Sequence, residues 1–461
     1  MGLLARFSLG FISMTLLVLP SVNAQEPPAQ ADSNSIDSAS YEKPLYRKII
    51  FHGAVSMEDG QIVKGQYGAR GQGVQEYEHL WLSTNYLKLR PVVEINDRLK
   101  IKGGIVGKLW FDNFPSSAII NGTEINQSAH DFYIDRAEGI VRLLGNWQRP
   151  VLSLSAGIFP FKYNPDVRNL GEYLFRGPVS PGFLITAFDF QYATLSGFNL
   201  NSSIPIRKNV INQNLLLTTE TDIYPFHDFT LSYLVGAEVG KFLNCGAGIS
   251  FWHLVSVNEN VTTPKISTNI MYIDSSMNPR DTVYYTSRGT KLMARVSLDP
   301  KTFLPFSGIF GKEDLKLYGE ALVIGLKNYK EIYNKIWQRI PITFGFNFPG
   351  FKILDVLAIE GEWYGNPYWD ADKNLSLIYG PLPQPDDPSG GYTPTINGFT
   401  YDNWKWSVYA KKTILGGLSI VGQAARDHMR MSEKYEKYYD FEAALEKTSH
   451  WWWVAKIQYD F

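Results

Sequence analysis

The sequence predicts an all-β fold: a transmembrane, antiparallel, up-and-down β-barrel of about 16 strands, within a range of about 14–18. Apolar and polar residues alternate with a period of two along most of the chain, as in strands with one apolar face. Aromatic residues make up 14% of the chain and charged residues only 19%. Beyond the first 24 residues, no stretch reaches the about 20 apolar residues that a membrane helix needs.

The N-terminal residues 1–24 have the pattern of a secretory signal peptide. Arg6 precedes an apolar run over residues 7–19, and Val22-Asn23-Ala24 is a small-x-small cleavage pattern. A membrane anchor is the weaker interpretation, because the run is shorter than a spanning helix. Residues 25–47 are polar, rich in Pro and Ser, and without periodicity, so we expect a disordered polar leader. The barrel is then expected over residues 48–461.

Alternating stretches recur from residue 48 to the C-terminus, and their number is even, as up-and-down barrels of a single chain require. The expected strands are 48–57, 79–95, 98–112, 131–144, 150–160, 183–204, 210–221, 228–241, 245–257, 289–299, 313–326, 339–349, 353–365, 403–413, 417–428 and 450–461. The connections between them alternate between short turns and longer loops, except for a long turn at 300–312 and a short loop at 222–227. This alternation supports the strand number independently of hydropathy.

The hairpin around residues 87–111 shows how the two faces are assigned. Leu87 and Leu89 alternate with Lys88 and Arg90. Successive side chains of a strand point to opposite faces, so the apolar set is expected to meet lipid and the charged set a wet lumen. The same alternation gives these pore-lining candidates: Lys88, Arg90, Glu94, Lys100, Lys102, Lys108, Lys291, Arg295, Glu320, Glu360 and Glu362.

A sandwich of two sheets would also show alternation, but three features favour lipid. Apolar faces persist on nearly every strand, including both terminal strands, so no edge strand is protected by charge. The polar faces carry many ionisable residues, as a wet lumen permits. Aromatic residues also gather at strand ends, as at Trp404 with Trp406 and at Trp451–Trp453, in the manner of an interfacial girdle.

Two expected loops carry further candidates. The loop over 161–182 contains Arg168, Glu172 and Arg176, spaced by four, which one short helix would place on one face. One interpretation is a surface loop with solvated charges. The other is a loop that folds into the pore and narrows it, which makes these three residues constriction candidates. The loop over 366–402 is the longest, and it is interpreted as a lid or as an adhesive surface.

No motif for catalysis, nucleotide binding or metal binding stands out. None of the seven His has a His, Cys or paired carboxylate at metal-ligand spacing. Glu360 and Glu362 lie two apart on one strand, whereas glycosidase carboxylates flank a sugar bond from both sides. The net charge of −1 implies no nucleic-acid partner, and the single Cys245 excludes an internal disulfide framework. We therefore expect no enzyme activity, cofactor or metal. A lipase or acyltransferase stays open, because such sites assemble across strands without a short motif.

The last strand carries Ile457, Tyr459 and Phe461, an apolar residue at every second position with a terminal phenylalanine. This ending resembles the C-terminal signature of Gram-negative outer-membrane proteins, which the barrel-insertion machinery reads in that family. Together with the signal peptide and the strands, this resemblance covers almost the whole chain. Within that class, the length and the strand number of the chain look like those of porins. Residues 157–178 (GIFPFKYNPDVRNLGEYLFRGP) are loosely similar to a porin segment where a strand runs into a Pro-Phe turn and a long loop.

The resemblance implies a location in the outer membrane, contact with its lipid, and insertion by the barrel-insertion machinery with Ile457, Tyr459 and Phe461 as the signal. It implies passive diffusion of small polar solutes or ions through a water-filled lumen, and it allows a homo-trimer. The alternative is a non-conducting barrel whose long extracellular loops bind a surface ligand or partner, or which is structural.

Overall fold

The computed structural model describes residues 47–68, 75–112, 128–176, 193–219, 227–259, 270–273, 279–283, 288–305, 307–326, 335–364, 404–426, 442–444 and 449–461. The expected signal peptide, nearly all of the polar leader and the 366–402 loop lie outside these ranges.

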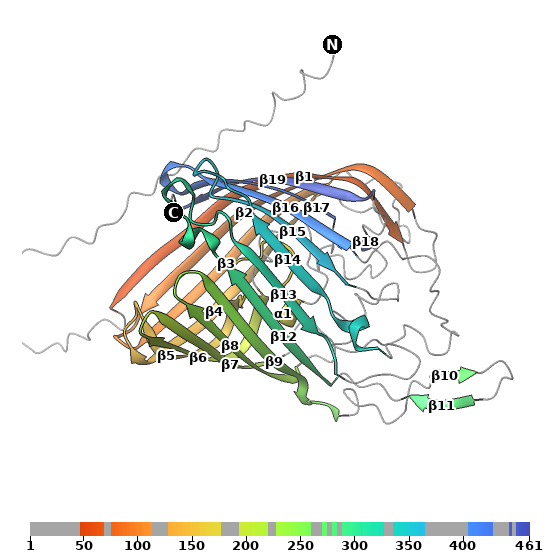
Figure 1. Ribbon diagram of the computed structural model, residues 1–461, viewed down its shortest axis with the longest axis horizontal. Helices are drawn as coiled ribbons and strands as arrows, with labels where there is room; N and C mark the ends of the chain where they lie inside the picture. Colours follow the sequence, from red (N-terminus) through yellow and green to blue (C-terminus); the bar gives the residue numbers. More distant parts are fainter. Residues whose placement is uncertain are drawn as a thin grey trace, which may run out of the picture. The chain divides into compact units, whose positions relative to one another are not determined.

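Seventeen strands share the main sheet, and sixteen of them form a closed antiparallel ring (Figure 1), which confirms the predicted fold class and strand number. In chain order the sixteen are β1 (Lys48–Gly68), β2 (Gln75–Glu94), β3 (Leu99–Asp112), β4 (Ser128–Gly145), β5 (Pro150–Phe161), β6 (Ala193–Ile206), β7 (Asn209–Thr219), β8 (Phe229–Val239), β9 (Leu243–Val255), β12 (Gly289–Leu298), β13 (Leu317–Val323), β14 (Ile342–Asn347), β15 (Val356–Trp363), β16 (Trp404–Thr413), β17 (Leu418–Arg426) and β19 (Trp451–Asp460).

The ring closes where the last strand meets the first. β1 pairs with β2 on one side and with β19 on the other, and β9 pairs with β12. At the seam, Gly53 and Phe461 exchange two backbone hydrogen bonds, with N···O distances of 2.8 and 2.9 Å. Each of the sixteen strands therefore has a partner on both sides, as backbone groups in a bilayer require.

Short turns join the strands at one end of the barrel, which we call the short-turn end. In the β2–β3 turn, the Asn96 side-chain oxygen accepts hydrogen bonds from the backbone N–H groups of Arg98 and Leu99 at 2.8 and 2.9 Å. Asn closes tight turns in this way because its side chain bonds to the backbone a few residues further on. Most longer connections join strands at the opposite end, as predicted. The exceptions are the β1–β2 connection at that end, 69–74, which is short, and the β12–β13 connection at the short-turn end, 299–316, which is long.

The two faces of each strand differ as alternation predicts. On β2, Leu87 and Leu89 are 46% and 43% exposed on the outside, whereas Tyr86 on the inner face is 3% exposed. On β19, Ile457 and Tyr459 are exposed, whereas Lys456, which precedes Ile457, is buried on the inner face. The outer surface is therefore a broad apolar belt, which is the surface that lipid would cover.

The structure corrects several expected boundaries. β1 continues to Gly68 and pairs with β2 up to Tyr67, although 58–78 was expected to be a loop. Outward polar residues such as Asp59 and Gln61 interrupt the apolar alternation there, so the sequence hides the strand. β18 (Glu442–Ala444) extends the sheet beside β1, and β10 (Ile270–Ile273) and β11 (Pro279–Val283) form a separate hairpin within the expected 258–288 loop.

Other boundaries also differ. β13, β14 and β15 are shorter than expected, and β6 is continuous through the Ser196-Gly197 pair. The 3-10 helices η1 (Pro300–Phe303) and η2 (Ser307–Ile309) occupy the long 300–312 connection. No helix in the described ranges is long and apolar enough to cross a membrane.

Candidate functional site

The chain that follows β5 lies inside the barrel. Residues 162–176, which we call the docked segment, end in the one-turn helix α1 (Tyr173–Arg176), which packs against β12 and β13 (Figure 1). In the ring of strands, β13 lies six places from β5, and β15 lies eight places from it, halfway round. The docked segment therefore crosses the lumen to the wall opposite its own strand.

Glu360 on β15 holds the middle of the docked segment. Its carboxylate accepts hydrogen bonds from three consecutive backbone N–H groups, those of Arg168, Asn169 and Leu170, at 2.5, 2.8 and 2.9 Å. The Tyr318 hydroxyl donates a fourth hydrogen bond at 2.9 Å. A carboxylate with this many donors is a strong acceptor, because each hydrogen bond is assisted by its charge.

Glu320 on β13 holds both ends of the docked segment. Its carboxylate accepts hydrogen bonds from the backbone N–H groups of Glu172 and Tyr173 at 3.1 and 3.0 Å. It also accepts a hydrogen bond from the Asn164 amide at 2.8 Å and another from the Tyr163 hydroxyl. One side chain thus ties the start of the segment to its end.

Glu362 completes this surface, which we call the acidic wall: the inner faces of β13 and β15 that carry Glu320, Glu360 and Glu362. The Glu362 carboxylate accepts a hydrogen bond from the Tyr173 hydroxyl at 2.8 Å and pairs with the Lys405 ammonium at 3.2 Å. The three glutamates are 3%, 2% and 0% exposed in the order named. Expected as pore-lining groups, they point inward but lie beneath the docked segment.

A glycine breaks the helix that the spacing of four suggests. Gly171 has a φ of +97°, and a Cβ atom there would lie 3.1 Å from the Thr343 side chain. Glu172 follows with a φ of 62°. Arg168 and Glu172 therefore precede α1, and the expectation that one helix presents them with Arg176 on one face is wrong. The Arg176 side chain lies outside the described part of the structure.

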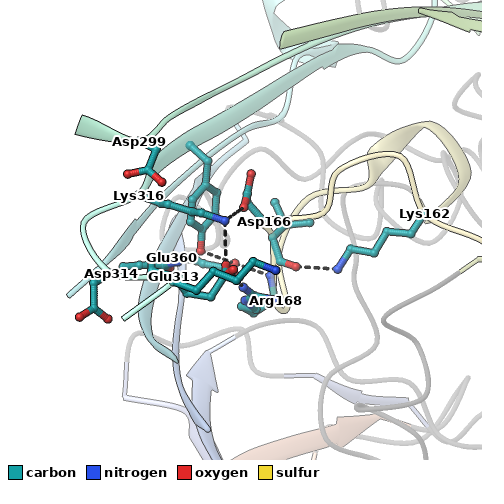
Figure 2. Close-up of polar contacts among 12 residues, drawn as sticks. Lys162, Asp166, Arg168, Asp299, Glu313, Asp314, Lys316 and Glu360 are labelled. Carbon is teal, nitrogen blue, oxygen red and sulfur yellow. Dashed lines mark hydrogen bonds and ion pairs between the residues drawn. The ribbon is translucent and has the colours of Figure 1, made fainter. Parts of the chain in front are cut away.

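Ion pairs fasten the start of the docked segment to the chain just before β13 (Figure 2). The Lys316 ammonium lies 3.1 Å from Asp166 and 2.9 Å from Glu313, and the Arg168 guanidinium lies 3.0 Å from Glu313. Burial acts to raise the pKa of Asp166, but the Lys316 charge and hydrogen bonds from Ser297 and Lys316 hold it below its usual range. Burial acts to lower the pKa of Lys316, but the charges of Asp166 and Glu313 hold it above its usual range.

Apolar packing supports the other side of the docked segment. Tyr163, Tyr173 and Leu174 of the segment are buried against inward apolar side chains of the barrel. The remaining buried members of this cluster are Phe159, Phe161, Leu216, Leu234, Met293, Leu322, Ile324 and Tyr364. Hydrogen bonds, ion pairs and apolar contacts thus all favour one position of the segment.

The inner faces of β2 and β3 carry the candidates Lys88, Arg90, Lys100, Lys102 and Lys108, and we call this surface the basic wall. Its charges form ion pairs mainly with carboxylates of neighbouring strands. The Arg90 guanidinium lies 2.6 Å from Asp135 on β4, and the Lys100 ammonium lies 2.5 Å from Glu94 on β2.

Next to the seam, a compact charged cluster continues the basic wall. The Lys456 ammonium on β19 lies 3.9 Å from the Glu58 carboxylate on β1. The ammonium groups of Lys88 and Lys456 lie 5.2 and 5.6 Å from the centre of the Tyr86 ring, within the range of cation–π attraction. Sequence reasoning missed Glu58 because it ended the first strand at Met57.

The two other predicted cations, Lys291 and Arg295, lie on the inner face of β12. The Lys291 ammonium lies 3.6 Å from the centre of the Trp252 ring and 3.5 Å from the Leu174 carbonyl oxygen of the docked segment. The Arg295 guanidinium donates to the side-chain oxygen of Asn244 at 2.8 Å. Lys291 therefore belongs to the support of the docked segment, and Arg295 lies nearer the short-turn end.

The residues of the expected insertion signal lie together on the outer face at the seam. Ile457, Tyr459 and Phe461 are 54%, 45% and 53% exposed. The Tyr459 and Phe461 rings stack with a centroid distance of 6.3 Å. Phe461 also covers Gly53, where a Cβ atom would overlap the phenylalanine ring.

Sequence reasoning missed the main partners in this site. Asn164, Asp166 and Tyr173 stand in the expected loop, where the sequence alone does not show which wall they contact. Lys316 and Lys405 lie inside the predicted strands 313–326 and 403–413, but neither was among the pore-lining candidates. In the described ranges, no group of three or more His, Cys, Asp or Glu side chains is placed to hold a metal ion.

Comparison with known proteins found distant structural matches alone. No protein-family model and no curated protein matched the sequence. Among solved structures, Salmonella typhi OmpF has a TM-score of 0.44 and 9% identity, over 90% of this chain and 97% of that chain. Pseudomonas putida OprB has a TM-score of 0.44 and 10% identity, over 90% and 94%. A triple mutant of the Rhodopseudomonas blastica porin has a TM-score of 0.37 and 7% identity, over 90% and 100%.

These structural matches are distant, and the barrel architecture rests on the strand pairings of this chain itself. By those pairings, the chain has a porin-like fold, a closed antiparallel barrel of sixteen strands.

Proposed function

We propose that this protein is an outer-membrane channel for the passive diffusion of small polar solutes or ions, narrowed by the docked segment. The observation that carries the proposal is the path of residues 162–176, which leave β5 and bind the opposite wall. A barrel of about 16 strands is wide enough to keep an aqueous lumen. A segment held across the lumen reduces its cross-section without filling it.

The charges of the two walls assign different roles to the predicted residues. Glu320, Glu360 and Glu362 position the docked segment, because their oxygens are bonded to it or to a neighbouring strand. The basic wall supplies the charged surface that faces the remaining lumen. Rings of side-chain charge set ion preference in pores, so the basic wall is expected to favour anions.

The proposal includes the location and the assembly of the protein. The apolar outer belt would contact outer-membrane lipid, and the exposed Ile457, Tyr459 and Phe461 would be recognised by the barrel-insertion machinery. Export would use residues 1–24 as a signal peptide. A homo-trimer is the assembly that we propose for the inserted protein.

Conductance in planar bilayers tests the channel directly. We expect stable, stepwise currents from the purified, refolded protein in symmetric salt. A barrel that inserts, shows heat-modifiable migration and passes no current at any salt concentration would favour the alternative, a barrel that acts by surface binding.

Cysteine labelling then tests which face is wet. In a Cys245→Ala background, Lys102→Cys on the inner face should react with a charged, water-soluble thiol reagent, and each channel should lose current. Ile101→Cys on the outer face of the same strand is the matched control, and its current should not change. Equal responses of the two variants would contradict the assignment of the lumen.

A further inference from the structure

A cavity of 640 Å³ lies between the docked segment and the barrel wall at the short-turn end. The ends of β8, β9, β12, β15 and β16, the β8–β9 turn and the connection before β13 line it, together with Pro165, Asp166 and Arg168 of the docked segment. This volume falls within the about 300–1,000 Å³ typical of small-molecule sites. The cavity lies apart from the hydrogen bonds that hold α1.

The lining carboxylates of this cavity are mostly neutralised by partners. Asp166 and Glu313 pair with Lys316, as described above. Asp299 pairs with Lys301 at 2.7 Å, and Asp355 lies 3.7 Å from Lys412; neither lysine lines the cavity. Of the lining acids, Glu238 alone makes no ion pair among the described residues, and its carboxylate accepts a hydrogen bond from Asn212 at 3.3 Å.

Among the described residues, three lining lysines are not neutralised in this way. Lys241 in the β8–β9 turn, Lys312 before β13 and Lys411 near the end of β16 line the cavity. In the described part of the chain, none of them forms an ion pair with a carboxylate. Lysine carries a positive charge at neutral pH, so three cations face one unpaired acid, Glu238. With Lys301 and Lys412 counted beside the lining residues, seven cations stand against five carboxylates, so the net charge around the cavity is positive.

The rest of the lining is suited to an organic molecule. Phe242 and Tyr409 contribute aromatic surface, and Asn244, Ser297 and Thr413 contribute hydrogen-bonding groups. A few polar groups that fix orientation beside aromatic surface are typical of small-molecule sites.

We propose that this cavity is a binding site for small multivalent organic anions, recognised through their carboxylate or phosphate groups by Lys241, Lys312 and Lys411. The site deepens the proposed function, because it lies inside the barrel wall where a permeating solute would pass. An anion held there raises the local concentration of the solute at the short-turn end.

Calorimetric titration of the full chain in detergent at low ionic strength tests the site without any need for conduction. The probes are citrate, glucose 6-phosphate, inorganic phosphate and uncharged sucrose. We expect citrate to bind and sucrose not to bind, and the two phosphate probes show whether carboxylate or phosphate is preferred. In the triple variant Lys241→Gln, Lys312→Gln and Lys411→Gln, the Kd for citrate should rise by about tenfold or more, because each lost charge weakens attraction to the anion.

The matched control is Lys48→Gln with Arg207→Gln and Lys208→Gln. It removes the same charge from exposed positions at the same end of the barrel, outside the cavity lining. The Kd for citrate in this control should change by less than about twofold. Glu238→Gln should tighten citrate binding, because it removes the unpaired acid of the lining, and this gain cannot arise from misfolding.

The outcomes separate the site from the channel. Equal citrate affinities in the two triple variants, or no citrate binding by the unmodified protein, would overturn the proposed site. If citrate binds as expected but the protein passes no current in bilayers, the channel proposal fails and the binding site stands. If current flows but citrate does not bind, the reverse holds.

Discussion

The acidic wall and the basic wall carry their charges on the same inward face of the strands, but they use them differently. Glu360 on the acidic wall accepts hydrogen bonds from three backbone N–H groups of the docked segment. On the basic wall, Arg90 pairs with Asp135 on β4 and Lys100 with Glu94 on β2. One wall therefore positions a segment of chain, and the other pairs part of its charges with carboxylates of the barrel wall. Inward direction alone does not show that a charge meets the lumen.

The largest effect is expected at the seam that closes the ring next to the basic wall. Phe461→Asp places a carboxylate on the outer face and removes the ring that covers Gly53. We expect export without insertion, with at least about a tenfold loss of heat-modifiable protein in the outer membrane, because a charge facing lipid is costly. Gln458→Asp, on the same strand but on the inner face, is the control and should insert normally. Normal insertion of the Phe461 variant would disprove the terminal signal.

The second largest effect is expected from removal of the main anchor on the acidic wall. Glu360→Ala leaves three backbone N–H groups without their acceptor, at about 1–3 kcal/mol for each buried group. The docked position should lose at least about 3 kcal/mol, so the segment should leave the wall and single-channel conductance should rise. Glu94→Ala on the basic wall breaks one partly exposed ion pair and should change stability by less than about 1 kcal/mol. Unchanged conductance in Glu360→Ala would mean that the segment does not narrow the pore.

Much of the barrel could be predicted, because membrane strands obey one strong rule. Lipid on one side and water on the other require alternation, so Leu89 outside and Lys88 inside follow from the pattern. The rule fails where outward residues are polar, as at Asp59 and Gln61, so the predicted strand 48–57 ends too early.

The docked segment was harder to predict, because its partners are distant in sequence. Glu320 and Glu360 show the same alternation as Lys88, and only the packed structure shows that the segment covers them. The spacing of Arg168, Glu172 and Arg176 suggested a helix. Gly171 is the residue that signals otherwise, because glycine tolerates the positive φ that ends a helical pattern.

A fall in pH is expected to release the docked segment. The pKa of Asp166 is lowered in the folded protein, so its stabilisation is present above about pH 4 and is lost as the pH falls through the folded value. The pKa of Lys316 is raised, so its stabilisation is complete below about pH 10 and is lost as the pH rises through the folded value. Conductance should therefore rise as the pH falls through the folded pKa of Asp166.

The variant Asp166→Asn tests that assignment. It should raise conductance at neutral pH toward the value in acid, and its change on acidification should be smaller than in the unmodified protein. Asp97→Asn, in the β2–β3 turn and paired with Arg47, is the control and should keep the original pH profile. Identical pH profiles in the Asp166 variant and the unmodified protein would remove this ion pair from the control of the segment.

The smallest effect concerns ion selectivity. The variant Lys88→Glu with Arg90→Glu reverses two charges of the basic wall, while the glutamates of the acidic wall stay beneath the docked segment. The reversal potential in a salt gradient should shift toward cations, most clearly at low ionic strength, because 0.1 M salt screens charges over about 10 Å. Glu320→Gln on the acidic wall should leave selectivity unchanged. A larger shift in Glu320→Gln than in the double variant would reverse the roles of the two walls. Leu89→Glu, between the two cations but on the outer face, should reduce insertion instead, and its normal insertion would mean that the two faces of β2 are exchanged.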